Sequence, residues 1–121
     1  MPLDIEALRE YCIKKKGVTE EFPFGNETLV YKVMGKVFLL GGIDNRPFTF
    51  NAKCDPALAL ELREKYEDVQ PGYHMNKKHW NTVVAEGRIP KKELLEMVDH
   101  SYSLVVNGLP KIMKDKLNKL K

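Results

Sequence analysis

The side chains that could bind a ligand directly gather in one segment, residues 71–83, with the sequence PGYHMNKKHWNTV. Its thirteen positions hold one tyrosine, two histidines, two lysines, two asparagines and the chain's single tryptophan. Lysine binds phosphates as a point charge, asparagine bonds base edges or sugar oxygens, and aromatic and histidine rings stack on bases. A β-ribbon tip with such groups has the right shape to enter a nucleic-acid groove. The side chains that would make this contact are Tyr73, His74, Asn76, Lys77, Lys78, His79 and Trp80.

The same segment also has a purely structural interpretation. In a strand, Trp80, Thr82 and Val84 would share one face, and the residues between them would share the other. Trp80 would then be a large core residue whose ring N–H is bonded locally. Lys77 and Lys78 would form a solvated turn. The residues alone favour this structural interpretation slightly over contact with nucleic acid.

Motifs for catalysis or metal binding are absent from the sequence. It contains no GxxxxGK[ST], GxGxxG, HExxH or GxSxG. His74 and His79 are five positions apart and His100 is distant, so no metal-ligand set is visible. The consecutive residues 99–101 (Asp-His-Ser) would point in different directions on a helix and could not relay a proton. We therefore expect no enzyme activity, no cofactor and no metal.

The charge of the chain is concentrated at its C-terminal end. Of 121 residues, which fit a single domain spanning residues 1–121, the last eleven hold five lysines and one aspartate. That segment carries +4, whereas the whole chain carries +3, so the remaining 110 residues carry −1. A nucleic-acid function would therefore need a local basic patch. The adjacent Glu20 and Glu21 are expected to be solvated.

The composition also bears on the compartment. No apolar run approaches the length of a membrane span, so no membrane partner is expected. The segment MPLDIEALRE contains acids and lacks the apolar core of a signal peptide, which favours the cytoplasm. Cys12 and Cys54 are 42 positions apart and fit no metal spacing. Two buried, reduced thiols are therefore expected in place of a disulfide.

Four segments carry helix signals. Asp4 and Asp55 are placed as N-caps, and Pro56 follows at the first helical position, where a missing N–H costs nothing. Pro90 opens a long apolar stripe. The predicted helices are residues 4–16, 55–66, 90–107 and 109–118.

The remaining elements are predicted as strands. FTFNAKC alternates, with Phe48, Phe50 and Ala52 on one face, which is typical of an antiparallel sheet packed on one side. The predicted strands lie near residues 28–34, 37–43, 47–53, 70–75 and 79–85. Strands joined by hairpins and interrupted by single helices predict a two-layer α+β domain with a five-stranded antiparallel sheet.

Several blocks along the chain resemble the MmcQ/YjbR-like family of small, cytoplasmic bacterial proteins. They are FPFG, TLVYKVMGKVFLL, KCDPALALELREKY, PGYHMNKKHWNTV and LLEMVDHSYSLVVNGLPK, and the likeness runs over about residues 4–117. This resemblance implies a fold like that of type III secretion chaperones and CyaY-like domains, with helices on one side of the sheet. It implies DNA binding through a double-wing arrangement of β-elements, which would map onto residues 73–80. It supplies no catalytic residues.

Two functional hypotheses follow, and an unrecognised enzyme ranks behind both. In the first, the protein binds DNA through residues 73–80, with Lys32, Lys36 and Lys53 as candidates at the rim. In the second, it binds a protein or a small ligand in an apolar groove lined by residues 22–25 (FPFG) and Trp80. DNA binding would weaken steeply with salt, whereas an apolar groove would be nearly insensitive to it.

Overall fold

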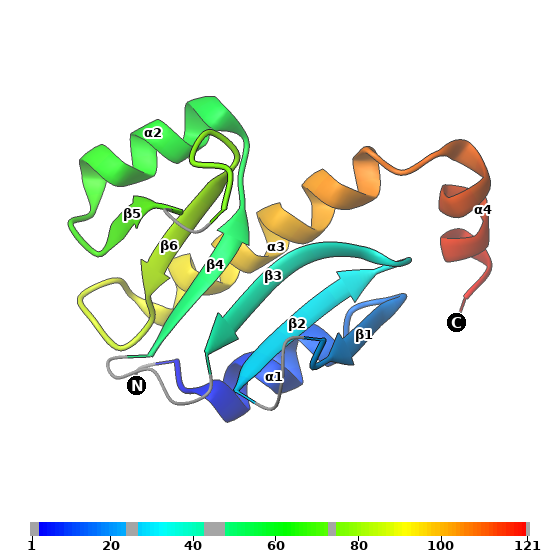
Figure 1. Ribbon diagram of the computed structural model, residues 1–121, viewed down its shortest axis with the longest axis horizontal. Coiled ribbons are helices and arrows are strands. Elements are labelled where there is room, and N and C mark those ends of the chain that lie inside the picture. The colour runs from blue at the N-terminus through cyan, green and yellow to red at the C-terminus, as the bar shows by residue number, and fades with distance from the viewer. Residues whose placement is uncertain (1–2, 24–26, 43–47, 73–74, 121) are drawn as a thin grey trace.

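The structure, a computed structural model, describes residues 3–23, 27–42, 48–72 and 75–120. It contains a six-stranded sheet with four helices (Figure 1). The strands are β1 Val18–Glu21, β2 Thr28–Val33, β3 Lys36–Gly42, β4 Thr49–Lys53, β5 Val69–Pro71 and β6 Trp80–Val84. The helices are α1 Ile5–Ile13, α2 Pro56–Lys65, α3 Lys91–Asn107 and α4 Lys111–Lys119. The sheet order is β1-β2-β3-β4-β6-β5, and every neighbouring pair is antiparallel, as predicted.

One face of the sheet carries the core. Phe50 pairs with Val83 and Ala52 with Asn81, and these four side chains share that face because strand residues alternate. Helices α1 and α3 lie behind the sheet, α2 lies near β5 and β6, and α4 lies at the far end (Figure 1). Among the fully buried residues are Leu8 of α1, Phe38 of β3, Phe50 of β4, and Leu94 and Val98 of α3.

The predicted helix starts are confirmed. The Asp4 carboxylate accepts a hydrogen bond from the Ala7 N–H (2.8 Å), and the Asp55 carboxylate accepts from the N–H groups at the start of α2. Pro56 occupies the first position of α2. The first helix ends at Ile13, three residues earlier than predicted. Gly17 follows with a φ of +77°, a conformation that favours glycine.

The sheet has six strands, so the prediction of five is wrong. The additional strand, β1, is an edge strand with the sequence VTEE, which lacks the apolar alternation that reveals a strand. Glu20 was expected to be solvated, but its side chain is only 17% exposed. Its carboxylate accepts hydrogen bonds from Arg9 (3.0 and 3.1 Å) and from the Tyr31 hydroxyl (2.7 Å). These bonds join the strand to α1 and β2, and Val18 adds a partly buried apolar contact with the core.

Both cysteines are buried free thiols, as predicted. Burial raises the pKa of Cys12 to about 12 and that of Cys54 to about 11, so both stay protonated at neutral pH. Over the described residues, none of the helices is long and apolar enough to cross a membrane.

Candidate functional site

The turn between β5 and β6 carries part of the predicted contact site. Asn76, Lys77 and Lys78 are exposed there, and His79 is half-buried. Two of the seven predicted residues, Tyr73 and His74, lie outside the described residues. The predicted position of the two lysines, on a turn between two strands, is confirmed.

The backbone of this turn is fixed by hydrogen bonds. The Asn76 side-chain oxygen accepts from the Lys78 N–H (2.9 Å), and the Asn76 carbonyl accepts from the His79 N–H (3.1 Å). The Arg63 guanidinium of α2 donates to the carbonyls of Lys77 and Trp80. The turn is therefore held by α2, and the Asn76 oxygen is already engaged in it.

Trp80 has a structural position in this turn region. Its side chain is 9% exposed and shares the sheet face of Thr82, opposite the face that carries Asn81. A Cβ atom added to Gly72 would come within 2.9 Å of the Trp80 Cβ, so the chain at Gly72 runs close beside the Trp80 backbone. Burial of this kind leaves little of the ring for stacking on a base.

The three rim candidates do not form one cluster of free cations. Lys32 forms an ion pair with Glu21 (3.1 Å) on the outer strands, and Lys36 is exposed at the start of β3. Lys53 is half-buried at the end of β4, where it pairs with Trp80 in the sheet register. Lys53 is therefore the rim candidate next to the turn.

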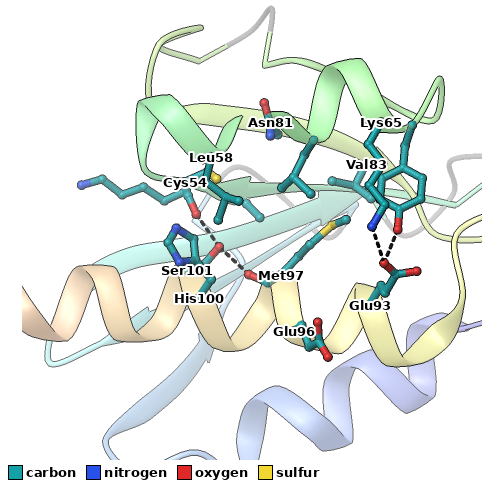
Figure 2. A pocket seen from close by; sticks show the side chains of 14 residues that line it. Cys54, Leu58, Lys65, Asn81, Val83, Glu93, Glu96, Met97, His100 and Ser101 are labelled. Carbon is teal, nitrogen blue, oxygen red and sulfur yellow. Dashed lines mark hydrogen bonds and ion pairs between the residues drawn. The ribbon is translucent and has the colours of Figure 1, made fainter. Parts of the chain in front are cut away.

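A pocket lies in a different place, between α2 and α3 over β4 and β6 (Figure 2). Its volume is about 190 Å³. Its floor and walls are mainly apolar and include Ala52, Val83, Leu58, Leu62 and Met97. Neither Phe22 nor Trp80 lines it, so this pocket is not the groove predicted at residues 22–25 and Trp80, and residues 24 and 25 of that prediction lie outside the described residues. Phe22 is instead 43% exposed elsewhere on the surface.

The pocket forms because its floor is made of small side chains. The inward face of β4 carries Phe50 and then Ala52, and the inward face of β6 carries Val83 and then Asn81. Leu58 and Leu62 lie four residues apart on α2 and so face the pocket together. Of the two residues on β4, the small Ala52 lines the pocket, whereas the large, buried Phe50 does not.

Asn81 is the unusual residue of the floor. It is 2% exposed, and its side-chain oxygen accepts a hydrogen bond from the Arg63 Nε (2.7 Å). An arginine N–H only donates, so the oxygen must face Arg63 and the amide nitrogen must face away from it. That nitrogen has no hydrogen-bond partner among the described residues. Leaving a buried donor unpaired costs about 1–3 kcal/mol.

The amide nitrogen of Asn81 lies on the pocket side of the floor and is itself buried. Asn81 lines the pocket whereas Arg63 does not. In Figure 2 the nitrogen lies on the pocket side of the Asn81 side chain and the oxygen lies on the other side. The signal for this residue was present in the sequence, because alternation in β6 places Asn81 beside Val83 on the inward face. The predicted site is instead centred on the turn, because aromatic and basic residues are concentrated there.

The mouth of the pocket carries a hydrogen-bonded carboxylate. Glu93 of α3 accepts from the Tyr66 hydroxyl and from the Lys65 Nζ (3.1 Å), as Figure 2 shows. The hydrogen bond from Tyr66, followed by that from Lys65, lowers the pKa of Glu93. Glu96 is exposed one turn along the same helix. The mouth therefore has two carboxylates, one of which is compensated by a lysine.

The remaining polar groups of the pocket are engaged with the backbone. His100 accepts at Nε2 from the Asp55 N–H (3.1 Å), and the Ser101 hydroxyl bonds the carbonyls of Lys53 and Met97. Asp99 points elsewhere, to the Tyr11 hydroxyl (2.8 Å). The prediction that residues 99–101 lie on a helix and point in different directions is confirmed. Over the described part of the chain, no group of three or more metal-ligating side chains comes together.

The family model named YjbR matches residues 13–104. The chain belongs to the YjbR family. Protein YjbR of Escherichia coli K12 is 35% identical over 109 residues, which cover 89% of this chain and 92% of that protein. Protein YbdF of Escherichia coli O157:H7 is 42% identical over 91 residues, covering 74% of each chain. Both are described as uncharacterized.

Solved structures of similar proteins have the same fold. The Deinococcus radiodurans protein DR2400, with a DUF419 domain, has a TM-score of 0.88 at 37% identity and covers 95% of this chain and 88% of its own. A Pseudomonas syringae protein has a TM-score of 0.72 at 26% identity and covers 84% of this chain and 97% of its own. YjbR membership and the α+β fold are thus established. Likeness to secretion chaperones and CyaY-like domains, and a cytoplasmic location, stay predictions.

Proposed function

We propose that this protein binds a small, mostly apolar molecule in the pocket between α2 and α3. One observation carries the proposal: the pocket floor holds a buried amide donor, Asn81 Nδ2, that no described residue satisfies. Buried polar groups are nearly always paired, so an unpaired one lining a cavity takes a partner from outside the chain, either solvent or a ligand. The apolar walls favour an organic molecule over a simple ion.

The size of the pocket suits a ligand of about one aromatic ring. An engineered apolar cavity of about 150 Å³ in another protein is large enough for benzene, and this pocket measures about 190 Å³. Binding is a better interpretation than catalysis, because the Cys54 thiol stays protonated at neutral pH and the His100 Nε2 lone pair is engaged. This pocket lies in a different place from the groove predicted at residues 22–25 and Trp80.

A filled-pocket variant tests the proposal. Benzene titrated into methyl-labelled protein should shift the Met97 and Val83 methyl signals saturably, with little dependence on salt. Ala52→Ile places its larger side chain in the pocket and should abolish the shifts. Ala57→Ile, an identical change at an exposed site on α2, should leave them intact. Failure of benzene to bind, or equal binding by Ala52→Ile, would contradict the proposal.

DNA binding through the β5–β6 turn is a second candidate, because Asn76, Lys77 and Lys78 are exposed on a turn whose backbone is fixed. The double change Lys77→Ala, Lys78→Ala should weaken DNA binding alike for all sequences and reduce the log–log salt slope by about two. The control Lys116→Ala, Lys119→Ala removes the same charge from α4. It should keep the steeper log–log salt slope of the wild-type protein. Equal slopes in the two variants would remove the turn from any DNA site.

A further inference from the structure

We infer that the pocket selects an uncharged carbonyl compound, whose oxygen accepts a hydrogen bond from Asn81 Nδ2, and that Arg63 positions the Asn81 amide for this contact. The inference rests on the proposed function, and it adds the chemical class of the ligand. It also assigns a role to Arg63, which lies outside the pocket.

The unpaired polar group of the pocket is a hydrogen-bond donor, so the partner that it needs is an acceptor. Asn81 Nδ2 is the one buried side-chain nitrogen or oxygen without a hydrogen-bond partner in the described part of the chain. The nearby Ser101 hydroxyl and His100 Nε2 already have partners in the backbone. A carbonyl oxygen only accepts, so it satisfies the amide without adding a donor that would itself need a partner.

The charges around the pocket favour a neutral ligand. A carboxylate would have to leave water for a floor whose single free group is a neutral amide, which is costly. The lining carries two carboxylates, Glu93 and Glu96, and two ammonium groups, Lys53 and Lys65, so it has no net charge that would draw in an anion. The Arg63 guanidinium gives no compensation, because it is directed to Asn81 Oδ1 and to the carbonyls of the β5–β6 turn. An ammonium group would meet the N–H of Asn81 with like polarity.

Arg63 determines which end of the Asn81 amide faces the ligand. A side-chain amide can present either its oxygen or its NH₂ group, and the two ends differ in hydrogen-bonding sense. The 2.7 Å bond from Arg63 Nε holds the oxygen outside the pocket. The same bond polarises the amide, which strengthens its N–H as a donor. Without Arg63 the amide is free to turn and present its oxygen instead.

Four one-ring molecules of similar size test this assignment on the whole 121-residue chain. Acetophenone supplies a carbonyl, ethylbenzene removes it, benzoate adds a negative charge and benzylammonium adds a positive one. We expect acetophenone to bind about tenfold more tightly than ethylbenzene in NMR titrations that follow the Met97 methyl signal. Benzoate and benzylammonium should bind more weakly than ethylbenzene. Equal affinities of acetophenone and ethylbenzene would overturn the inference.

Two variants separate the roles of the side chains. Asn81→Leu should bring the acetophenone-to-ethylbenzene ratio close to one while ethylbenzene still binds, which shows that the pocket is intact. Arg63→Met should lower the same ratio and raise the relative affinity of benzyl alcohol, which can donate to a turned amide. A variant whose ratio stays at the wild-type value would contradict the role assigned to that residue.

The outcomes distinguish this inference from the proposed function. If ethylbenzene binds and acetophenone gains nothing, the pocket is a binding site but its ligand is not a carbonyl compound, and only the inference fails. If none of the four molecules binds, the proposed function fails and the inference falls with it.

Discussion

Two ends of the same sheet use an arginine in different ways. At one end, Arg9 of α1 reaches across to Glu20 on β1, and Tyr31 of β2 completes this group, the Arg9 network. At the other end, Arg63 of α2 reaches down to Asn81 on β6 and to the turn before it, the Arg63 network. Both arginines join a helix to a strand across the layers of the domain.

The two networks differ in completeness. In the Arg9 network the Glu20 carboxylate meets three donors, and the hydrogen bond from Arg9 lowers the pKa of Glu20. In the Arg63 network the Asn81 amide uses its oxygen and leaves its nitrogen beside a cavity. In our proposal, the complete network holds the fold together, whereas the incomplete one beside the cavity takes its missing partner from a bound molecule.

Trp80→Ala should have the largest effect on stability. Trp80 lies next to Asn81 in sequence but on the other face of the sheet, and it is 9% exposed. Removing a large buried ring should lower the free energy of unfolding by about 3–5 kcal/mol, measured by urea denaturation. Trp80→Phe should cost less because it keeps an aromatic ring. A loss within about 0.5 kcal/mol, the usual surface range, would make Trp80 an exposed contact residue.

Tyr31→Phe tests the Arg9 network and should have the next largest effect. The change removes only the hydroxyl, which donates to Glu20 at 2.7 Å from a fully buried ring. Loss of a hydrogen bond to a charged group should cost about 1.5–3 kcal/mol in the same denaturation assay. An unchanged free energy of unfolding would mean that the Arg9 network does not contribute to the stability of the fold.

Asn81→Leu tests the Arg63 network and should have a much smaller effect. The change removes one hydrogen bond from Arg63, but it also removes the unpaired buried donor. Because these contributions oppose each other, we expect the free energy of unfolding to change by less than about 1 kcal/mol. A loss as large as that of Tyr31→Phe would place Asn81 among the structural residues and remove the contrast between the two ends.

The smallest expected effect is a pH dependence at the Arg9 network. A carboxylate whose pKa is lowered in the folded state stabilises the fold above its unfolded value, about 4.3 for glutamate. This contribution is lost as the pH falls through the lower, folded pKa of Glu20. The stability difference between wild type and Glu20→Gln should therefore be largest near pH 7 and shrink in acid. A difference that is independent of pH would contradict the assigned ion pair.

The elements that the sequence predicted well are those whose signals are local. Asp4 and Asp55 mark helix starts because an N-cap depends on the next few residues only. Strand β1 was missed because its partners, Arg9 and Tyr31, are eleven residues away from Glu20 in either direction. Its own residues carry almost no apolar pattern.

The candidate site was only partly predictable for a related reason. The sequence favoured the exposed turn because aromatic, basic and amide side chains are concentrated there in one short segment. The pocket depends on what is small or unpaired: Ala52 where a larger residue would fill the floor, and Asn81 with one end of its amide unused. Neither property belongs to a residue alone, since both arise when α2 and α3 pack over β4 and β6.

The side-chain amide of Asn81 gives the most direct test of the central claim. Its NH₂ protons can be followed in ¹H–¹⁵N spectra while acetophenone is added to the wild-type protein. A new hydrogen bond to a carbonyl should move these protons downfield, saturably and with the same affinity as the Met97 methyl signal, while ethylbenzene should not produce the downfield shift. Asn81 protons that do not move while acetophenone saturates the pocket would contradict the account.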